Sequence, residues 1–350
     1  MVRTPRRPNA TFAILFATSC AACAGGGEPP GEDAGEAAGG SSDTASVATS
    51  GPTPGARCEE LGAILRGAAS ASGDVCRVAF PRGDLSVTLL GANLPAGMGL
   101  TSWAAFAPAG SRGSIVMGDL ALTAMELPPV MAGLRRNGIR TTAVHRHMSG
   151  DRPAMSFMHY LGIGASDSLA RGLAAALDAA PSARGGARDE EGAGTAVGSE
   201  PGIVAGASCD DIARTLGADP ESADRGPGYC KVSLPRADLD VRVDGRSVPA
   251  TLGIGSWFAF QQTRDGAEAV IAGDMALTEE QVNPAIGALR EAGIDVVALH
   301  NHMLFDEPRV VFFHFQARGA PDELARGLAA GLRAAGLGGS GTAGAGDGEP

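Results

Sequence analysis

The six histidines of this chain fall into two triplets with the same internal spacing. Imidazole nitrogens ligate transition metals and transfer protons near neutral pH. A residue type that occurs nowhere else in 350 residues, and recurs in one pattern, predicts a metal site or a proton-transfer site in each half of the chain. The first triplet is His145, His147 and His159, and the second is His300, His302 and His314.

The spacing of the second triplet brings its rings together if the surrounding residues form a β-hairpin. His300 and His302 are two apart in an apolar, strand-like run, so their side chains leave one face, about 6.5–7 Å apart. His314 ends the next such run, and a hairpin around residues 306–308 would place it opposite His300, with Cβ atoms about 5 Å apart. The connecting loop must have an odd number of residues, because a slip of one residue sends His314 to the other face. The first triplet has the same spacing and the same condition.

Three such histidines are able to hold one zinc ion with an open position at which water is activated. Glu307, at the expected hairpin tip, and Asp274, at the expected end of a strand, are the candidates for general base or fourth ligand. In the first half, Arg152 stands in place of Glu307 and Arg146 in place of Asn301. The second half therefore predicts the more complete site.

Other interpretations of these residues remain open. The histidines are also compatible with a metal-free binding or catalytic cluster, or with hydrogen-bonded core positions preserved by duplication. Asp119 and Asp274 each follow a glycine and precede a helix, which favours a turn or capping role over ligation. Trp103 and Trp257 are expected in the core. Copper is the less favoured metal, because strand alternation points most of the neighbouring methionines to the opposite face: Met148, Met158 and Met303.

The chain repeats itself at a nearly constant offset. Phe-Pro-Arg-Gly-Asp-Leu at 80–85 returns as Leu-Pro-Arg-Ala-Asp-Leu at 234–239, and Leu-Ala-Arg-Gly-Leu occurs at 169–173 and at 324–328. Two copies indicate a tandem duplication rather than a solenoid. The expected organisation is a first repeat domain at 56–180, a linker at 181–205, a second repeat domain at 206–336 and a disordered tail at 337–350.

Each copy has the pattern of strands followed by a strand–helix–strand–strand–helix unit. In the second copy, Thr278 followed by Gln281 is a capping box that opens a helix, and Thr123 with Glu126 takes this place in the first. Short strands with two helices per copy predict an α+β fold, in which an antiparallel sheet carries two helices on one face.

The N-terminus is typical of an exported protein. Three arginines precede an apolar run at 11–22 that is too short for a convincing membrane span, which predicts a signal peptide over 1–23. Cys20 and Cys23 each follow small residues, as in a lipobox, so one of them is expected to be lipidated; cleavage without lipidation is the alternative. Residues 24–55 are rich in Gly, Ser, Thr, Glu and Pro, a composition that predicts a disordered tether. We therefore expect the chain on the extracytoplasmic face of the membrane, held by a lipid anchor.

The remaining four cysteines are evenly distributed between the two copies. In an exported protein, such local spacing predicts the disulfides Cys58–Cys76 and Cys209–Cys230, each stabilising the fold by about 3 kcal/mol. A thiolate metal site is the less favoured alternative.

The charge and the lysine content of the chain argue against several classes of binding partner and chemistry. The net charge is −11 and the basic residues form no stripe, which argues against nucleic acid, because phosphate binding needs a positive face. Lys231 is the single lysine, so a phosphate-binding P-loop is excluded and Schiff-base chemistry is not expected. No Gly-x-Ser-x-Gly nucleophile motif occurs.

Several segments resemble the LppY/LpqO family of bacterial lipoproteins. They are Phe-Pro-Arg-Gly-Asp-Leu at 80–85, Gly-Ser-Trp at 255–257, residues 273–284, Ala-Leu-His-Asn-His-Met at 298–303, and Phe-Phe-His at 312–314. The resemblance covers both copies, and the first copy departs from it at Arg146, Arg152 and 127–129. The family is a domain of unknown function found in envelope lipoproteins, so the resemblance implies a duplicated, anchored protein and no settled activity.

Two functions therefore compete. One is an envelope-anchored zinc protein with a three-histidine site in each repeat, and with hydrolysis as its activity. The other is a non-enzymatic module that binds a small molecule or a cell-wall component in a pocket between the repeats. A purely structural role is the third interpretation.

Overall fold

The computed structural model describes residues 54–110, 113–186 and 200–338, which belong to one compact unit. The expected signal peptide with Cys20 and Cys23 lies outside the described residues. So do the expected tether up to residue 53, the middle of the linker at 187–199, and the tail from residue 339.

The first repeat forms a six-stranded antiparallel sheet with three helices. The strand order in the sheet is β1-β2-β5-β6-β8-β7. The strands are β1 (Ala68–Ser72), β2 (Val75–Pro81), β5 (Thr101–Pro108), β6 (Ser114–Leu122), β7 (Arg140–His145) and β8 (Ser156–Gly164). The helices are α1 (Pro54–Leu65), α2 (Leu127–Arg136) and α3 (Ser166–Asp178), and the short elements are β3 (Thr88–Leu89), β4 (Ala92–Asn93) and the 3-10 helix η2 (Pro181–Arg184).

The second repeat has the same topology, with the strand order β11-β12-β15-β16-β19-β17. Its strands are β11 (Asp224–Gly226), β12 (Tyr229–Pro235), β15 (Gly255–Gln262), β16 (Ala269–Thr278), β17 (Asp295–His300) and β19 (Val310–Gly319). Its helices are α4 (Cys209–Thr215), α5 (Glu279–Glu291) and α6 (Pro321–Ala334). The short elements are β9 (Ile203–Val204), β10 (Ala207–Ser208), η4 (Pro220–Ser222), β13 (Arg242–Val243), β14 (Arg246–Ser247), η5 (Ala250–Leu252) and β18 (Asp306–Glu307).

The predicted α+β class and the tandem duplication are confirmed, with one addition. Each repeat has a third helix, α1 or α4, that the sequence pattern did not predict. Each of these helices carries a cysteine of a predicted disulfide. Cys58–Cys76 joins α1 to β2, and Cys209–Cys230 joins α4 to β12. Within the described part of the chain, no helix is both long and apolar enough to cross a membrane.

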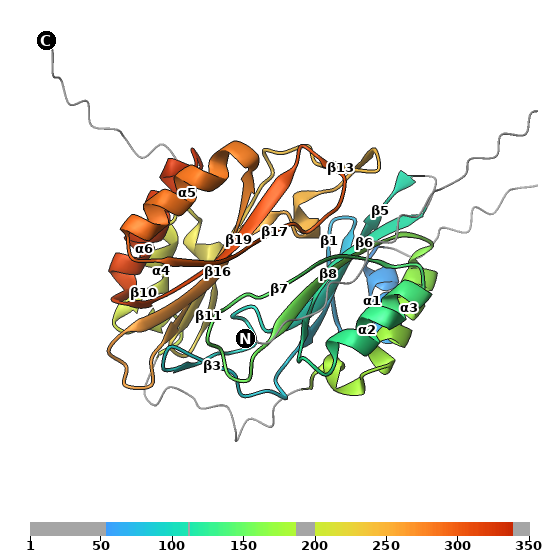
Figure 1. The fold of residues 1–350 in the computed structure, drawn as a ribbon, viewed down its shortest axis with the longest axis horizontal. Helices are drawn as coiled ribbons and strands as arrows, with labels where there is room; N and C mark the ends of the chain where they lie inside the picture. The colour runs from blue at the N-terminus through green and yellow to red at the C-terminus, as the bar shows by residue number, and fades with distance from the viewer. Residues whose placement is uncertain (1–53, 111–112, 187–199, 339–350) are drawn as a thin grey trace, which may run out of the picture. The chain divides into compact units, whose positions relative to one another are not determined.

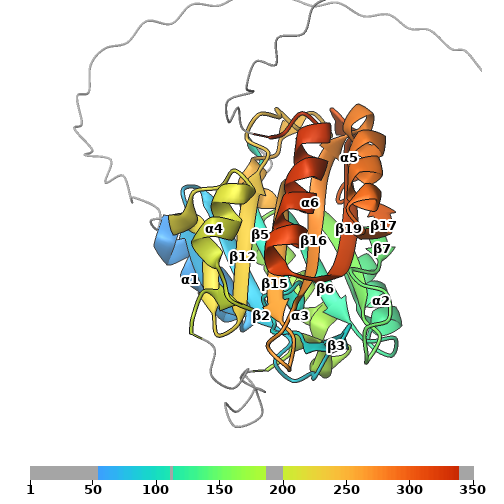
Figure 2. The ribbon, with the colours of Figure 1, turned by 90° about the vertical axis from the view of Figure 1, so that its left-hand side faces the viewer.

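The two faces of each sheet bury against different partners. In β6, Val116 and Leu120 pack under the helices of the first repeat, whereas Ile115 and Met117 pack toward the second repeat. Because strand side chains alternate, Asp119 faces the second repeat. The layers therefore follow the order helices, sheet, sheet, helices (Figure 1). Figure 2 shows α4, α5 and α6 lying across the outer face of β12, β15, β16 and β19.

A loop of each repeat also packs against the inner face of the other repeat's sheet. Val243 and Leu252, from the β13–η5 segment, join the cluster that contains Ala105 of the first sheet. In the reciprocal contact, Leu89 from the β3–β4 segment joins the cluster that contains Val270 of the second sheet. The exchange closes the space between the sheets at both ends and leaves the middle for polar residues.

The predicted capping box forms in the second repeat only. Thr278 and Gln281 cap the start of α5 reciprocally. In the first repeat the Thr123 N–H donates to the Glu126 carboxylate at 2.7 Å, but α2 begins later, at Leu127. Two prolines follow Leu127, and proline suits the first turn of a helix, where its missing N–H would have no partner.

Candidate metal centre

The structure places both histidine triplets in one cluster between the inner faces of the two sheets. The rings of His145 and His300, which are equivalent in the two repeats, stack with centroids 3.8 Å apart. The Nε2 atoms of His145 and His314 lie 3.2 Å apart. The prediction of a separate site in each repeat is therefore corrected: six rings share one location at the junction of the repeats. We call these six residues the histidine cluster.

Contacts across the junction follow an approximate twofold symmetry. The ring centroids of His147 and His314 are 4.0 Å apart, and those of the equivalent pair, His302 and His159, are 3.9 Å apart. The duplication therefore built one symmetric centre from two copies of the same surface.

The hairpin register differs from the prediction without changing the outcome. His300 pairs with Phe312, and His314 pairs with Ala298, so His300 and His314 are not directly opposite. A bulge interrupts β17, and the connection at 301–309 contains β18, which pairs with β13 instead of forming a tight tip. The offset is two residues, and an even offset keeps both histidines on one face. Strands β7 and β8 have the equivalent register.

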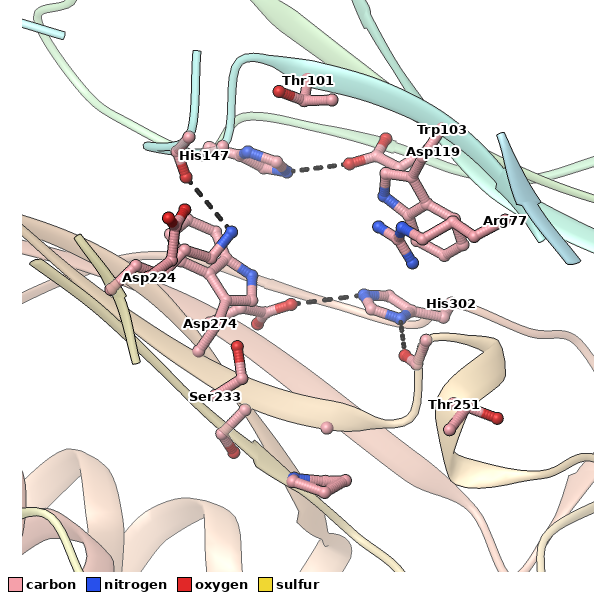
Figure 3. Close-up of a pocket in the computed structure, with 18 of the residues that line it drawn as sticks. Arg77, Thr101, Trp103, Asp119, His147, Asp224, Ser233, Thr251, Asp274 and His302 are labelled. Carbon is pink, nitrogen blue, oxygen red and sulfur yellow. Dashed lines mark hydrogen bonds and ion pairs between the residues drawn. The ribbon is translucent and has the colours of Figure 1, made fainter. Parts of the chain in front are cut away.

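Asp119 and Asp274 lie inside the centre rather than at turns or helix caps. Each occupies the interior of a central strand and is 5% and 2% exposed, respectively, which corrects the expected turn or capping role and the expected strand end. An Oδ2 atom of Asp119 lies 3.1 Å from Nε2 of His147, and that of Asp274 lies 3.3 Å from Nε2 of His302. Figure 3 shows these two pairs facing each other across the pocket. Burial, followed by the charge of Asp119, raises the pKa of Asp274 well above its ordinary value.

Backbone carbonyls orient three of the rings. The Nδ1 atoms of His159, His302 and His314 lie 3.2, 3.0 and 2.9 Å from carbonyl oxygens. A carbonyl only accepts, so Nδ1 carries the proton, and Nε2 of the neutral ring presents a lone pair. Metal-ligating histidines are oriented in this way. The buried atoms without a hydrogen-bond partner in the described residues include Nε2 of His159 and His302 and Oδ1 of Asp119 and Asp274.

Burial keeps the histidine cluster neutral. Desolvation is the largest cause that lowers the pKa of every ring in it, and neighbouring imidazoles lower the pKa of His300 further. Neutral imidazole is the form that binds metal ions. The six rings are therefore in the protonation state that binds metal at neutral pH.

Three groups of side chains bring their ligand atoms within 4.8 Å of one another. The groups are His145–His147–His314, His145–His159–His300 and Asp274–His300–His302. The first and third share no residue and can be filled together, whereas the second competes with both. Imidazole nitrogen with carboxylate oxygen is a donor set that suits zinc. The donor set therefore fits up to two ions.

Other residues singled out from the sequence lie apart from the centre. Glu307 is exposed in β18 and pairs with Arg242 of β13, so the structure does not bring it to the histidines. Arg146 pairs with the Asp151 carboxylate at 2.7 Å. The candidate copper ligands Met148, Met158 and Met303 are each buried in a different apolar cluster.

A cavity of about 590 Å³ opens beside the centre and is lined by both repeats. Trp103 and Trp257, expected in the core, are half-buried and line this cavity. Arg77 and Lys231 line it from equivalent positions of β2 and β12. No motif in the sequence marks these two cations as site residues. Rarity was a signal for Lys231 alone of the two, since the chain has one lysine and two tryptophans and all three line this cavity.

Two equivalent glycines allow the loops to approach the cavity. Gly99 and Gly253 have φ angles of +80° and +102°. A Cβ atom at Gly253 would lie 2.6 Å from the Trp103 ring, and one at Gly99 would lie 2.9 Å from the Trp257 ring. Glycine is needed at both places for the backbone conformation and for the space.

The Pro-Arg-x-Asp-Leu motif stabilises the fold and is not part of the site. The buried Arg82 guanidinium donates to the Ala121 carbonyl and forms ion pairs with Asp84 and Glu126. Arg236 makes the equivalent bonds to Ala276 and Asp238. The motif thus ties one strand end to the start of the next helix.

Comparison with known proteins identifies the family and little more. No curated protein matches the sequence. PduB, a trimeric bacterial microcompartment shell protein, is 13% identical, with a TM-score of 0.19 over 77% of this chain and 89% of that one. EtuB from Clostridium kluyveri is 8% identical, with a TM-score of 0.19 over 77% of this chain and 90% of that one. Neither likeness supports a conclusion about fold or function.

The model of one protein family matches the chain twice, at residues 59–179 and 210–334. The two matches fall on the two repeats and cover more than half of the chain. The chain therefore belongs to the family described as Domain of Unknown Function (DUF1259) and carries that domain in two tandem copies.

Proposed function

We propose that this chain is a zinc-binding protein whose metal centre lies between its two repeats. The observation that carries the proposal is the contact between Nε2 of His302 and Oδ2 of Asp274, at 3.3 Å. Because Nδ1 of His302 is committed to the Gly253 carbonyl, both facing atoms are acceptors when the ring is neutral and the acid ionised. Two buried acceptors at this distance need a cation or a shared proton between them.

The groups His145–His147–His314 and Asp274–His300–His302 are the proposed ligand sets. A zinc ion with an open position supplies Lewis acidity and generates a nucleophile from water near neutral pH. The adjoining cavity of about 590 Å³ gives a substrate access to such a position, which supports a hydrolytic role. Asp119 and Asp274 are the nearby carboxylates able to accept a proton, and Glu307 has no part in this proposal.

We further propose that the protein acts outside the cytoplasm, anchored to the membrane by lipid at Cys20 or Cys23, as in LppY/LpqO lipoproteins. The disulfides Cys58–Cys76 and Cys209–Cys230 support an oxidising compartment. Metabolic labelling with a fatty-acid analogue tests the anchor. Label should be lost in the Cys20→Ser, Cys23→Ser double variant, and label that persists there would refute the anchor.

Elemental analysis of zinc-loaded, gel-filtered protein tests the metal centre. We expect one to two equivalents of zinc, because two ligand groups can be filled at once. His145 and His300 each belong to two groups, so the double change His145→Ala, His300→Ala interrupts all three groups and should abolish binding.

His159→Ala is the matched control for this experiment. It removes a buried imidazole but leaves the two compatible groups intact, so zinc content should stay at the parental level. Less than about a tenth of an equivalent in the parent, or an unchanged content in the folded double variant, would refute the metal centre. Circular dichroism establishes that each variant is folded.

The cavity between the repeats favours a second candidate function, a non-enzymatic binding module. Thermal-shift screening of the protein in chelator distinguishes the two. Stabilisation by an organic ligand that survives the histidine double change would support binding without metal chemistry.

A further inference from the structure

We propose that Arg77 and Lys231 bind the anionic group, a carboxylate or a phosphate, of a small organic ligand whose apolar body lies against Trp103 and Trp257. The inference goes beyond the zinc proposal, because neither cation belongs to a metal-ligand group. It assigns the cavity beside the histidine cluster to a class of ligand.

The first support is that neither cation has a carboxylate partner among the residues that the structure describes. Within the described residues, no ion pair involves Arg77 or Lys231, although both are only half exposed or less. Lys231 donates one hydrogen bond, to the Gly97 carbonyl at 3.2 Å. By contrast, Arg82, near the end of the same strand as Arg77, is paired with two carboxylates. Charged side chains that lose water are normally paired, so the unpaired donors indicate a ligand.

The second support is the way in which the two cations are held. The Arg77 guanidinium carbon lies 4.0 Å from the centre of the Trp103 ring, and the Lys231 Nζ lies 4.9 Å from that of Trp257. A cation over an aromatic face is held without using its N–H donors. Figure 3 shows Arg77 beside Trp103, next to the two histidine–aspartate pairs. The donors of Arg77 therefore remain available to an incoming anion.

The third support is that the two positive charges act on each other. Burial, followed by the positive charge of Arg77, lowers the pKa of Lys231 to about 8. An anion that contacts both would relieve this repulsion and would be bound by charge-assisted hydrogen bonds. Asp224 at the cavity edge is exposed and compensates Lys231 only in part.

The neighbouring carboxylates do not take the anion's place. Asp119 and Asp274 lie against His147 and His302, at 3.1 and 3.3 Å. Asp119 acts on Arg77 through its charge without forming an ion pair with it among the described residues. The cavity thus offers a ligand two carboxylates that face histidines and two cations that lie over tryptophan rings. A ligand with one anionic end is oriented by this difference.

The tryptophans provide the assay, because both tryptophans of the chain line the cavity. The full chain, in chelator and at constant ionic strength, is titrated with benzoate, phenyl phosphate and benzamide while intrinsic fluorescence is recorded. We expect a saturable change with benzoate or phenyl phosphate and none with neutral benzamide. The stronger of the two anions identifies the anionic group. No saturable change with either anion, or equal binding of benzamide, would overturn the proposal.

Arg77→Gln and Lys231→Gln should each weaken binding of the anion by at least about tenfold, because each removes a charge-assisted contact. Lys231→Arg should retain it. Arg326→Gln, an exposed change on α6, is the matched control and should leave affinity unchanged. If the Gln variants fail to fold, Arg77→Met and Lys231→Met, read against Arg326→Gln, decide the matter: a loss of affinity of at least about tenfold in both supports the site, and unchanged affinity in both overturns it.

Zinc content measured on the same samples separates the two proposals. In Arg77→Gln and Lys231→Gln, loss of anion binding with parental zinc content would support the anion site and show that neither cation contributes to zinc binding. Anion binding by protein that never retains zinc would overturn the metal centre and leave this site standing.

Discussion

His302 and Asp274 meet through two atoms that cannot hydrogen-bond to each other when the imidazole is neutral and the carboxyl ionised. Nε2 and Oδ2 are 3.3 Å apart, and Nδ1 of the same ring donates to a backbone carbonyl. In the duplicated pair, Nε2 of His147 lies 3.1 Å from Oδ2 of Asp119, but Nδ1 of His147 has no hydrogen-bond partner among the described residues, so this ring is free to donate to the carboxylate. The two-acceptor contact is therefore specific to His302 and Asp274, and either a bound cation or a shared proton satisfies both atoms.

Asp274→Asn should lower zinc affinity by about 10- to 100-fold, the usual effect of losing a group that ligates or supports a metal ligand. The amide keeps the shape of the carboxyl and removes the anionic oxygen. Competition with a chromogenic chelator measures the affinity. Glu307→Gln is the control, since it neutralises an exposed carboxylate in β18 and should leave the affinity unchanged. Equal effects of the two changes would exclude Asp274 as a ligand.

Zinc should stabilise the folded chain, because two of the three ligand groups combine residues of both repeats. At a free zinc concentration of 100 times Kd, linkage gives about 2.7 kcal/mol of added unfolding free energy. Urea unfolding with zinc or with chelator measures the difference. The His145→Ala, His300→Ala variant should unfold identically in both conditions, and a zinc effect that persists there would place the ion elsewhere.

Gly253→Ala should destabilise the fold by more than Gly245→Ala. Both glycines have a positive φ, at +102° and +74°, which costs a side chain of order 1–3 kcal/mol. Only at Gly253 would the new Cβ also meet a ring, at 2.6 Å from Trp103, whereas Gly245 has open space. Chemical denaturation measures both variants. Equal losses would mean that the Trp103 ring moves away without cost.

Lys231 should make the stability of the chain rise with pH in the alkaline range. Its pKa in the fold, about 8, is below the value of about 10.4 in an unfolded chain, so the unfolded state holds more of this proton between these pH values. The unfolding free energy from this group therefore rises with pH from about 8 to about 10.4, and the cost of the buried charge is fully present below about pH 8.

Comparison of the parent with Lys231→Gln across this range isolates the effect. Arg77 and Asp224 are the charged groups that act on Lys231, and both are kept in the variant. The parent should gain stability relative to the variant as pH rises. A constant difference between the two from pH 7 to pH 10.5 would contradict the lowered pKa.

Local pattern predicted much of the scaffold. The capping box at Thr278 located the start of α5, and the spacing of the cysteines predicted both disulfides. Period-two alternation placed His300 and His314 on one face even though their pairing was wrong by two residues. Helix α1 was missed, and Asp274 was assigned to a strand end because a glycine before it and a helix after it resemble a turn.

The sequence by itself determined that the chain is duplicated, that each copy is an antiparallel sheet with helices on one face, and that each histidine triplet shares a face. Repeats, hydrophobic alternation and capping are local properties that the chain carries wherever it packs. Only the tertiary structure decided that the two triplets meet at one centre, with Asp119 and Asp274 beside them and Arg77 and Lys231 across a shared cavity. Two identical faces are equally compatible with two separate sites and with one joint site, and the choice depends on how distant surfaces pack, which spacing along the chain does not encode.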